Sequence, residues 1–142
     1  MLIIGIDGMY AGKVTFGGRS LHALDSKVRN PYELVMTLLG ATLERFERNG
    51  LVSAFGFGDE RTKDKEVFPL GGGEGQLKGT PQLLAAYRKA VPTVKLSGPT
   101  SFAALVKRAA DIALQKKEVR VLCTVHENTS TSTSMRLLIL FY

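Results

Sequence analysis

The sequence of 142 residues is poor in cysteine and histidine. Its one cysteine, Cys123, cannot form a disulfide within the chain and excludes a zinc site built from several cysteines. Cys123 lies in an apolar run, so we expect it to be buried and unreactive. No Gly-x-Ser-x-Gly motif accompanies the two histidines, His22 and His126, which argues against a small α/β enzyme.

Long apolar runs are missing as well. No segment is long enough to span a bilayer. Met1 leads directly into the apolar run Leu2 to Ile6 and then Asp7, which does not match a signal peptide. We therefore expect a cytoplasmic location, with a nuclear or membrane-peripheral location as the alternatives.

The charge of the chain is positive but not concentrated. Nineteen Lys and Arg residues against thirteen Asp and Glu residues give a net charge of +6. The basic residues are scattered among acidic ones without a dense run, so we interpret them as solvated surface and expect no nucleic-acid partner. A hydrophobic content of 44% is sufficient for one packed domain.

Apolar runs and helix signals alternate along the chain. Asn30-Pro31-Tyr32-Glu33 has the pattern of a capping box with proline in the first helical turn. Short, mainly apolar runs predict strands over 2–6, 51–57, 66–70 and 119–125. Start signals predict helices from Pro31, from Thr80, and from Thr100 or Ser101. This order predicts an α/β fold, a mostly parallel sheet with helices on both faces. We expect Leu2–Ile6 in its centre, between the strands at 51–57 and 119–125.

Ligands of such sheets collect at the carboxyl ends of the strands. Asp7, the loop of residues 98–101 and Glu127 would share that edge. Two carboxylates and a hydroxyl suit a hard cation such as Mg²⁺ or Mn²⁺. The alternative is that both acids are solvated and that Thr100 or Ser101 is only a helix N-cap.

A set of ordered motifs between Leu2 and about Val125 resembles a known family. The motifs are Asn30-Pro31-Tyr32-Glu33, Gly40-Ala41-Thr42-Leu43, Gly56-Phe57-Gly58-Asp59, Val67-Phe68, Tyr87-Arg88 and Leu96-Ser97-Gly98-Pro99-Thr100-Ser101-Phe102. Together they resemble the copine-type von Willebrand A domain. Gly12-Lys13, Ser20-Leu21-His22 and Asp59 with Thr62 and Asp64 resemble one branch, the plant and protist RING-domain E3 ubiquitin ligases with a copine-like domain.

The resemblance implies a Rossmann-like von Willebrand A fold with a metal-ion-dependent adhesion site. Asp7 matches the first Asp of that site, and Thr100 matches its Gly-Pro-Thr threonine. Two hydroxyl ligands are missing, since Gly8-Met9-Tyr10-Ala11 follows Asp7, and Glu127 stands in place of the usual Asp. We therefore expect Asp7, Thr100 and Glu127 to bind Mg²⁺ or Mn²⁺ weakly or not at all, with Ca²⁺ less suited.

The last residues depart from the family pattern. We expect a von Willebrand A/copine-like domain over residues 1–128, incomplete at its C-terminus. Residues 129–142 would be a low-complexity Ser/Thr segment and an apolar tail. Because six consecutive Ser and Thr residues bury little apolar surface, we expect this tail to be poorly integrated.

The function implied by the resemblance is recognition of a protein. In the ligase branch the partner would be the substrate to be ubiquitinated. One cysteine cannot build a RING, so this chain alone would not be catalytic. The alternative is a copine-like adaptor that binds phospholipid with calcium, and only this alternative implies membrane association.

Overall fold

The computed structural model describes residues 2–7, 15–16, 19–43, 49–95, 97, 101–116, 121–128 and 134–141. For residues 15, 16, 19, 125–128 and 134–141 it describes the backbone only. Thr100 lies outside the described residues.

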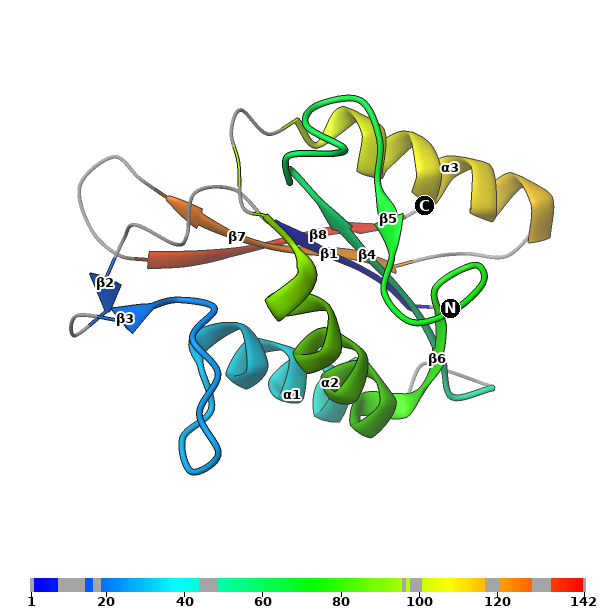
Figure 1. Cartoon of the computed structure of the whole chain (residues 1–142). Helices are drawn as coiled ribbons and strands as arrows, with labels where there is room; N and C mark the ends of the chain where they lie inside the picture. Colours follow the sequence, from blue (N-terminus) through cyan, green and yellow to red (C-terminus); the bar gives the residue numbers. More distant parts are fainter. Residues whose placement is uncertain are drawn as a thin grey trace.

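The main sheet is built around its first strand. Its order is β5-β4-β1-β7-β8 (Figure 1). These strands are β1 at Leu2–Asp7, β4 at Leu51–Phe57, β5 at Phe68–Pro69, β7 at Val121–Asn128 and β8 at Ser134–Phe141. β1 pairs in parallel with both β4 and β7. All six residues of β1 are buried, as its continuous apolar sequence predicts for a central parallel strand. The predicted central position of this strand is confirmed.

Helices cover both faces of the sheet, which confirms the predicted α/β architecture. Alternate side chains of β1 point to opposite faces. Leu2, Ile4 and Ile6 pack with residues of α1 (Pro31–Leu43) and α2 (Gly79–Ala90). Ile3 packs with residues of α3 (Ala103–Lys116) on the other face. Figure 1 shows α1 and α2 together on one side of the sheet and α3 on the other.

Short antiparallel strands border β4. β5 (Phe68–Pro69) pairs with its carboxyl half, as the predicted return of residues 66–70 requires, and β6 (Gln76–Lys78) pairs with its first residues. The sequence did not predict β6. A separate hairpin joins β2 (Thr15–Phe16) to β3 (Arg19–Ser20). A 3₁₀ helix, η2 (Val91–Thr93), extends the end of α2.

Residues 134–141 of the predicted tail form an edge strand, so the expectation of poor integration is wrong for them, while residues 129–133 and 142 lie outside the described residues. β8 (Ser134–Phe141) pairs antiparallel with β7 over its whole length, from Ser134 opposite Asn128 to Phe141 opposite Val121. Backbone hydrogen bonds to β7 compensate for the ordering of this segment, a contribution that composition does not reveal. The domain boundary at residue 128 stays a prediction.

Gly56 in β4 provides a test of close packing. A Cβ at this position would lie 2.1 Å from Cζ of Phe68. Gly56→Ala therefore forces the ring to move, and we expect a loss of about 1–3 kcal/mol in the free energy of unfolding. Gly72→Ala is the matched control, because a Cβ there meets nothing within 4 Å. Urea denaturation of both variants measures the difference, and equal stabilities would contradict the packing.

Candidate functional site

The predicted edge exists, and Asp7 lies on it. Asp7 is the last residue of β1 and pairs with Phe57, the last residue of β4. Glu127 belongs to β7, two positions beyond the residue that pairs with Ile6, so its backbone lies at the same end of the sheet. The side chain of Glu127 and all of Thr100 lie outside the description. The structure thus places the backbone of two of the three predicted ligands at one edge.

Asp7 is only 3% exposed. Its backbone carbonyl accepts a hydrogen bond from the Tyr32 hydroxyl at 3.3 Å, which ties the end of β1 to the first turn of α1. The resemblance to copine-type domains implies a divalent cation at this edge, so the fit of a metal can be tested here. Within the described ranges, no three His, Cys, Asp or Glu side chains are grouped so that they could hold a metal ion. Two of the three predicted ligands, Thr100 and the side chain of Glu127, lie outside those ranges, so the metal site stays a prediction.

A second carboxylate at this edge, that of Asp59, already accepts hydrogen bonds within the protein. Asp59 follows β4 and is 4% exposed. Its Oδ1 accepts a hydrogen bond from the Thr62 backbone N–H at 2.8 Å and another from the Thr62 hydroxyl. These bonds close the turn after β4, so Asp59 has a structural role there.

The hydroxyl before α3 also has a structural role. Ser101 Oγ accepts a hydrogen bond from the Ala103 backbone N–H at 3.2 Å. This satisfies one of the free N–H groups at the helix start. Ser101 therefore supports the start of α3 from one residue before the N-cap position, which Phe102 occupies, while Thr100 lies outside the described residues.

A buried cluster of polar side chains is linked to Asp7 through Tyr32. The sequence did not predict that these side chains contact one another. His22 Nδ1 and the Tyr87 hydroxyl are 2.7 Å apart, and Asn30 Nδ2 donates to the same hydroxyl at 3.3 Å. The His22 ring stacks on Tyr32 with 4.0 Å between ring centroids. The cluster thus joins the chain before α1 to both α1 and α2.

Burial controls the ionisation of this cluster. Desolvation lowers the pKa of His22 to about 4, although the nearby backbone of Asp7 partly opposes the shift. Burial likewise raises the pKa of Tyr87, and its hydrogen bond from Asn30 opposes that shift. His22 Nε2 has no hydrogen-bond partner in the described part of the chain. At neutral pH the cluster is therefore uncharged, with a neutral imidazole.

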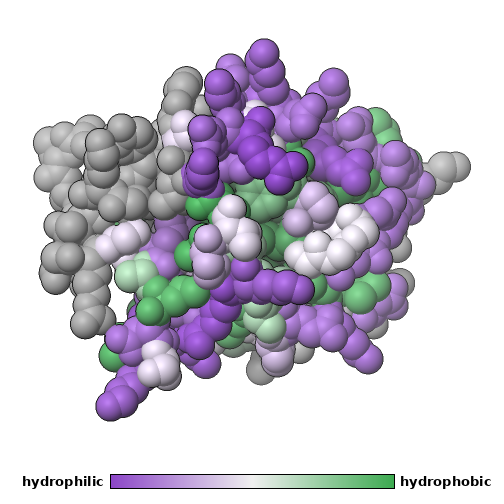
Figure 2. All heavy atoms as spheres, in the orientation of Figure 1, coloured by the Kyte–Doolittle hydropathy of each residue, from purple (hydrophilic) through white to green (hydrophobic). Residues whose placement is uncertain are grey.

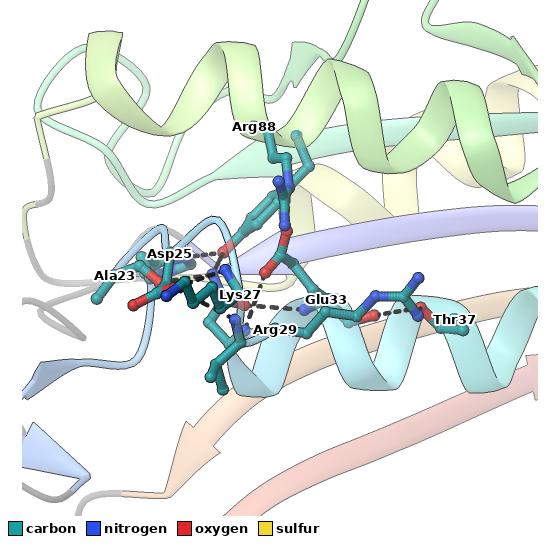
Figure 3. Close-up of polar contacts among 11 residues, drawn as sticks. Ala23, Asp25, Lys27, Arg29, Glu33, Thr37 and Arg88 are labelled. Atoms are coloured by element: carbon teal, nitrogen blue, oxygen red, sulfur yellow. Dashed lines mark hydrogen bonds and ion pairs between the residues drawn. The ribbon is translucent and has the colours of Figure 1, made fainter.

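The start of α1 is the predicted capping box, extended by an ion pair. Asn30 Oδ1 accepts from the Glu33 backbone N–H at 2.9 Å, and Glu33 Oε2 accepts from the Asn30 N–H at 2.9 Å. The second oxygen of Glu33 accepts from Arg88 Nε of α2 at 2.5 Å (Figure 3). The Glu33 side chain is 1% exposed, and that of Arg88 is 44% exposed. The carboxylate that caps α1 therefore also fixes α1 to α2.

Cys123 is fully buried, as predicted. Desolvation raises the pKa of its thiol to about 11. Since the thiolate is the nucleophilic form, Cys123 is unreactive at neutral pH.

The parallel sheet, the helices on both of its faces and the aspartate at its carboxyl edge define a Rossmann-like fold of the von Willebrand A type. The family model described as Copine matches residues 20–132. The chain belongs to the copine family. No helix in the part of the chain that the structure describes is both long and apolar enough to cross a membrane.

Two kinds of relative share this domain. Copine family protein 1 of Caenorhabditis elegans is 39% identical in an alignment of 135 residues that covers 92% of this chain and 12% of that protein. E3 ubiquitin-protein ligase RGLG4 of Arabidopsis thaliana is 40% identical over 115 residues, 78% of this chain and 28% of that protein. RGLG1 of the same plant is 40% identical over 118 residues, 80% of this chain and 24% of that ligase. The chain therefore spans less than a third of each relative.

Proposed function

We propose that this domain recognises a protein partner and is not itself a catalyst. The observation that carries the proposal is that one stretch of the chain aligns both with copine family proteins and with E3 ubiquitin-protein ligases. A domain shared by proteins of such different names supports a role in binding. By analogy with the ligases, the bound protein would be a substrate for ubiquitination.

The chemistry of the buried side chains also supports a binding role. The Cys123 thiol is held in its protonated form, and His22 is neutral and bonded to Tyr87. The buried polar groups of this cluster connect secondary structure elements and present no nucleophile to solvent. The fold therefore uses them for stability.

We further propose that the adhesion site is degenerate. Mg²⁺ needs about six oxygen ligands, some of them water, in near-octahedral geometry. Asp7 is the one predicted ligand whose side chain is described, and it is almost completely buried. Each missing ligand removes a favourable contact, while the cost of dehydrating the ion remains.

Titration calorimetry with Mg²⁺ and Mn²⁺ tests this prediction. We expect dissociation constants of about 1 mM or weaker, since few protein oxygens replace the ion's water. Asp7→Asn, which keeps the shape of the buried side chain, should change the isotherms little. Tight binding that Asp7→Asn abolishes would show that a working site exists.

A fusion experiment tests the recognition role. The chain is joined to the RING of RGLG4, and ubiquitinated proteins are compared with those produced by the RING alone. We expect the fusion to modify a defined set of additional proteins. A Lys116→Glu fusion, altered only at the exposed end of α3, should modify the same set. A product set identical to that of the RING alone would contradict the proposal.

The copine alternative is a phospholipid-binding adaptor, favoured by family membership and by the net charge of +6. Cosedimentation with phosphatidylserine vesicles separates the two functions. The protein-binding proposal expects no increase in pelleting when calcium replaces EDTA. A calcium-dependent increase would favour the adaptor.

A further inference from the structure

A groove of about 810 Å³ lies beside the sheet edge, between two segments that are distant in sequence. One wall is the turn and strand that follow β4, from Asp59 to Gly72. The other wall is formed by the end of α2 and by η2, from Ala86 to Val94. The Glu60 backbone N–H donates to the Lys95 carbonyl at 2.9 Å, so the walls are joined at the η2 end.

Apolar side chains line the interior of the groove. Val67, Phe68 and Val94 are each partly exposed there. The Phe68 ring packs directly against Gly56 of β4, which supports the ring on its sheet side. Figure 2 shows apolar surface at the centre of this face, with hydrophilic side chains above it. The volume falls within the range of functional binding clefts.

The groove is lined by more exposed basic side chains than exposed acidic ones. Arg61 on one wall and Lys89 on the other are exposed, and neither forms an ion pair with another described residue. Glu66 is the exposed acid that lines the groove. Asp59 also lines it but is buried and bonded to Thr62. Two available cations therefore face one available carboxylate.

We propose that this groove binds an extended segment of the protein partner in which an aliphatic residue is flanked by carboxylates. The inference rests on the proposed function, since it names the part of the partner that is recognised. In an extended chain, successive side chains point in opposite directions. An aliphatic side chain on the apolar floor therefore directs its two neighbours toward the rim, where Arg61 and Lys89 lie.

Three fluorescein-labelled nonapeptides test the proposal by fluorescence anisotropy. They share a central leucine and differ in its flanking residues, which are all Asp, all Ser or all Lys. The variants are Arg61→Glu, Lys89→Glu and Ala86→Leu, the last of which narrows the groove without a change of charge. Lys116→Glu is the matched control, since it makes the same charge change at the exposed end of α3. Circular dichroism verifies that each variant is folded.

We expect the acidic peptide to bind at least about tenfold more tightly than the other two, and each groove variant to weaken it about tenfold. Lys116→Glu should have less than about a twofold effect. An equal loss for Lys116→Glu would show general attraction to a cationic chain and overturn the proposal. Absence of binding by all three peptides would also overturn it, while the RING fusion would still test the proposed function. Loss of phosphatidylserine vesicle binding in the groove variants, without peptide binding, would assign the groove to lipid instead.

Discussion

Replacing Glu33 with alanine is expected to lower the free energy of unfolding by about 3 kcal/mol, because the substitution breaks a buried ion pair and removes a helix cap. Glu33 accepts hydrogen bonds from the Asn30 N–H and from Arg88 Nε. The carboxylate is almost completely buried, whereas Arg88 is partly exposed. Arg88 can therefore regain water in the variant, which holds the loss below the upper end of the range for buried pairs.

Urea denaturation of two variants measures this effect. Glu60→Ala is the control, since Glu60 pairs with Lys95 at 3.5 Å and both side chains are more than half exposed. We expect the control to lose at most about 1 kcal/mol. Similar losses for Glu33→Ala and Glu60→Ala would show that the connection between α1 and α2 does not depend on the buried carboxylate.

Acid is expected to destabilise the protein through His22. Burial lowers the pKa of this histidine from 6.5 to about 4 in the folded state. As the pH falls below 6.5, the unfolded chain therefore binds a proton that the folded chain does not. The contribution of His22 is fully present above pH 6.5 and is lost progressively toward pH 4, for a total of about 3 kcal/mol.

A His22→Gln variant separates this contribution from that of the carboxylates. Gln keeps a polar group near the Tyr87 hydroxyl but does not titrate. Stability is measured by urea denaturation between pH 7.5 and pH 4.5 for both proteins. We expect the wild type to lose more stability than the variant as the pH falls. Parallel pH profiles would contradict the buried neutral imidazole.

Much of the fold could be predicted because the signals are local. The apolar runs of β1 and β7 identify central strands, and Asn30 with Glu33 forms the predicted capping box. Boundaries were less accurate, since α3 begins at Ala103 rather than at Thr100 or Ser101. Short strands such as β6 carry little periodicity, and their pairing depends on the neighbour that the fold provides.

The surroundings of the site depend on contacts between distant residues. Asp7 could be placed at the carboxyl edge because it follows an apolar strand. The position of Arg88 beside Glu33 could not, because the two residues are 55 positions apart and meet only when α1 packs on α2. The same holds for His22 and Tyr87, which are 65 positions apart. The Tyr87-Arg88 motif marked one residue of each pair. The spacing of residues along the sequence does not predict that their partners are His22 and Glu33.

The tail shows how composition can mislead. Its six Ser and Thr residues led us to expect poor integration, yet Ser134, the one of the six that the structure describes, belongs to β8. Pairing with β7 supplies the backbone hydrogen bonds that composition leaves out. The outer side of β8 is at the end of the sheet order, and its sequence carries only Arg136 as a charge. Edge strands are usually protected by more charge than this.

The most direct test of the account is the affinity of a partner identified with the RING fusion, measured with and without divalent metal. Biolayer interferometry compares the wild type and Asp7→Asn in EDTA, in Mg²⁺ and in Mn²⁺. If recognition does not depend on a metal, no ion contributes to the interface. We then expect the dissociation constants of both proteins in all three buffers to agree within about twofold. Binding that requires Mg²⁺ or Mn²⁺ and that Asp7→Asn abolishes would contradict the account.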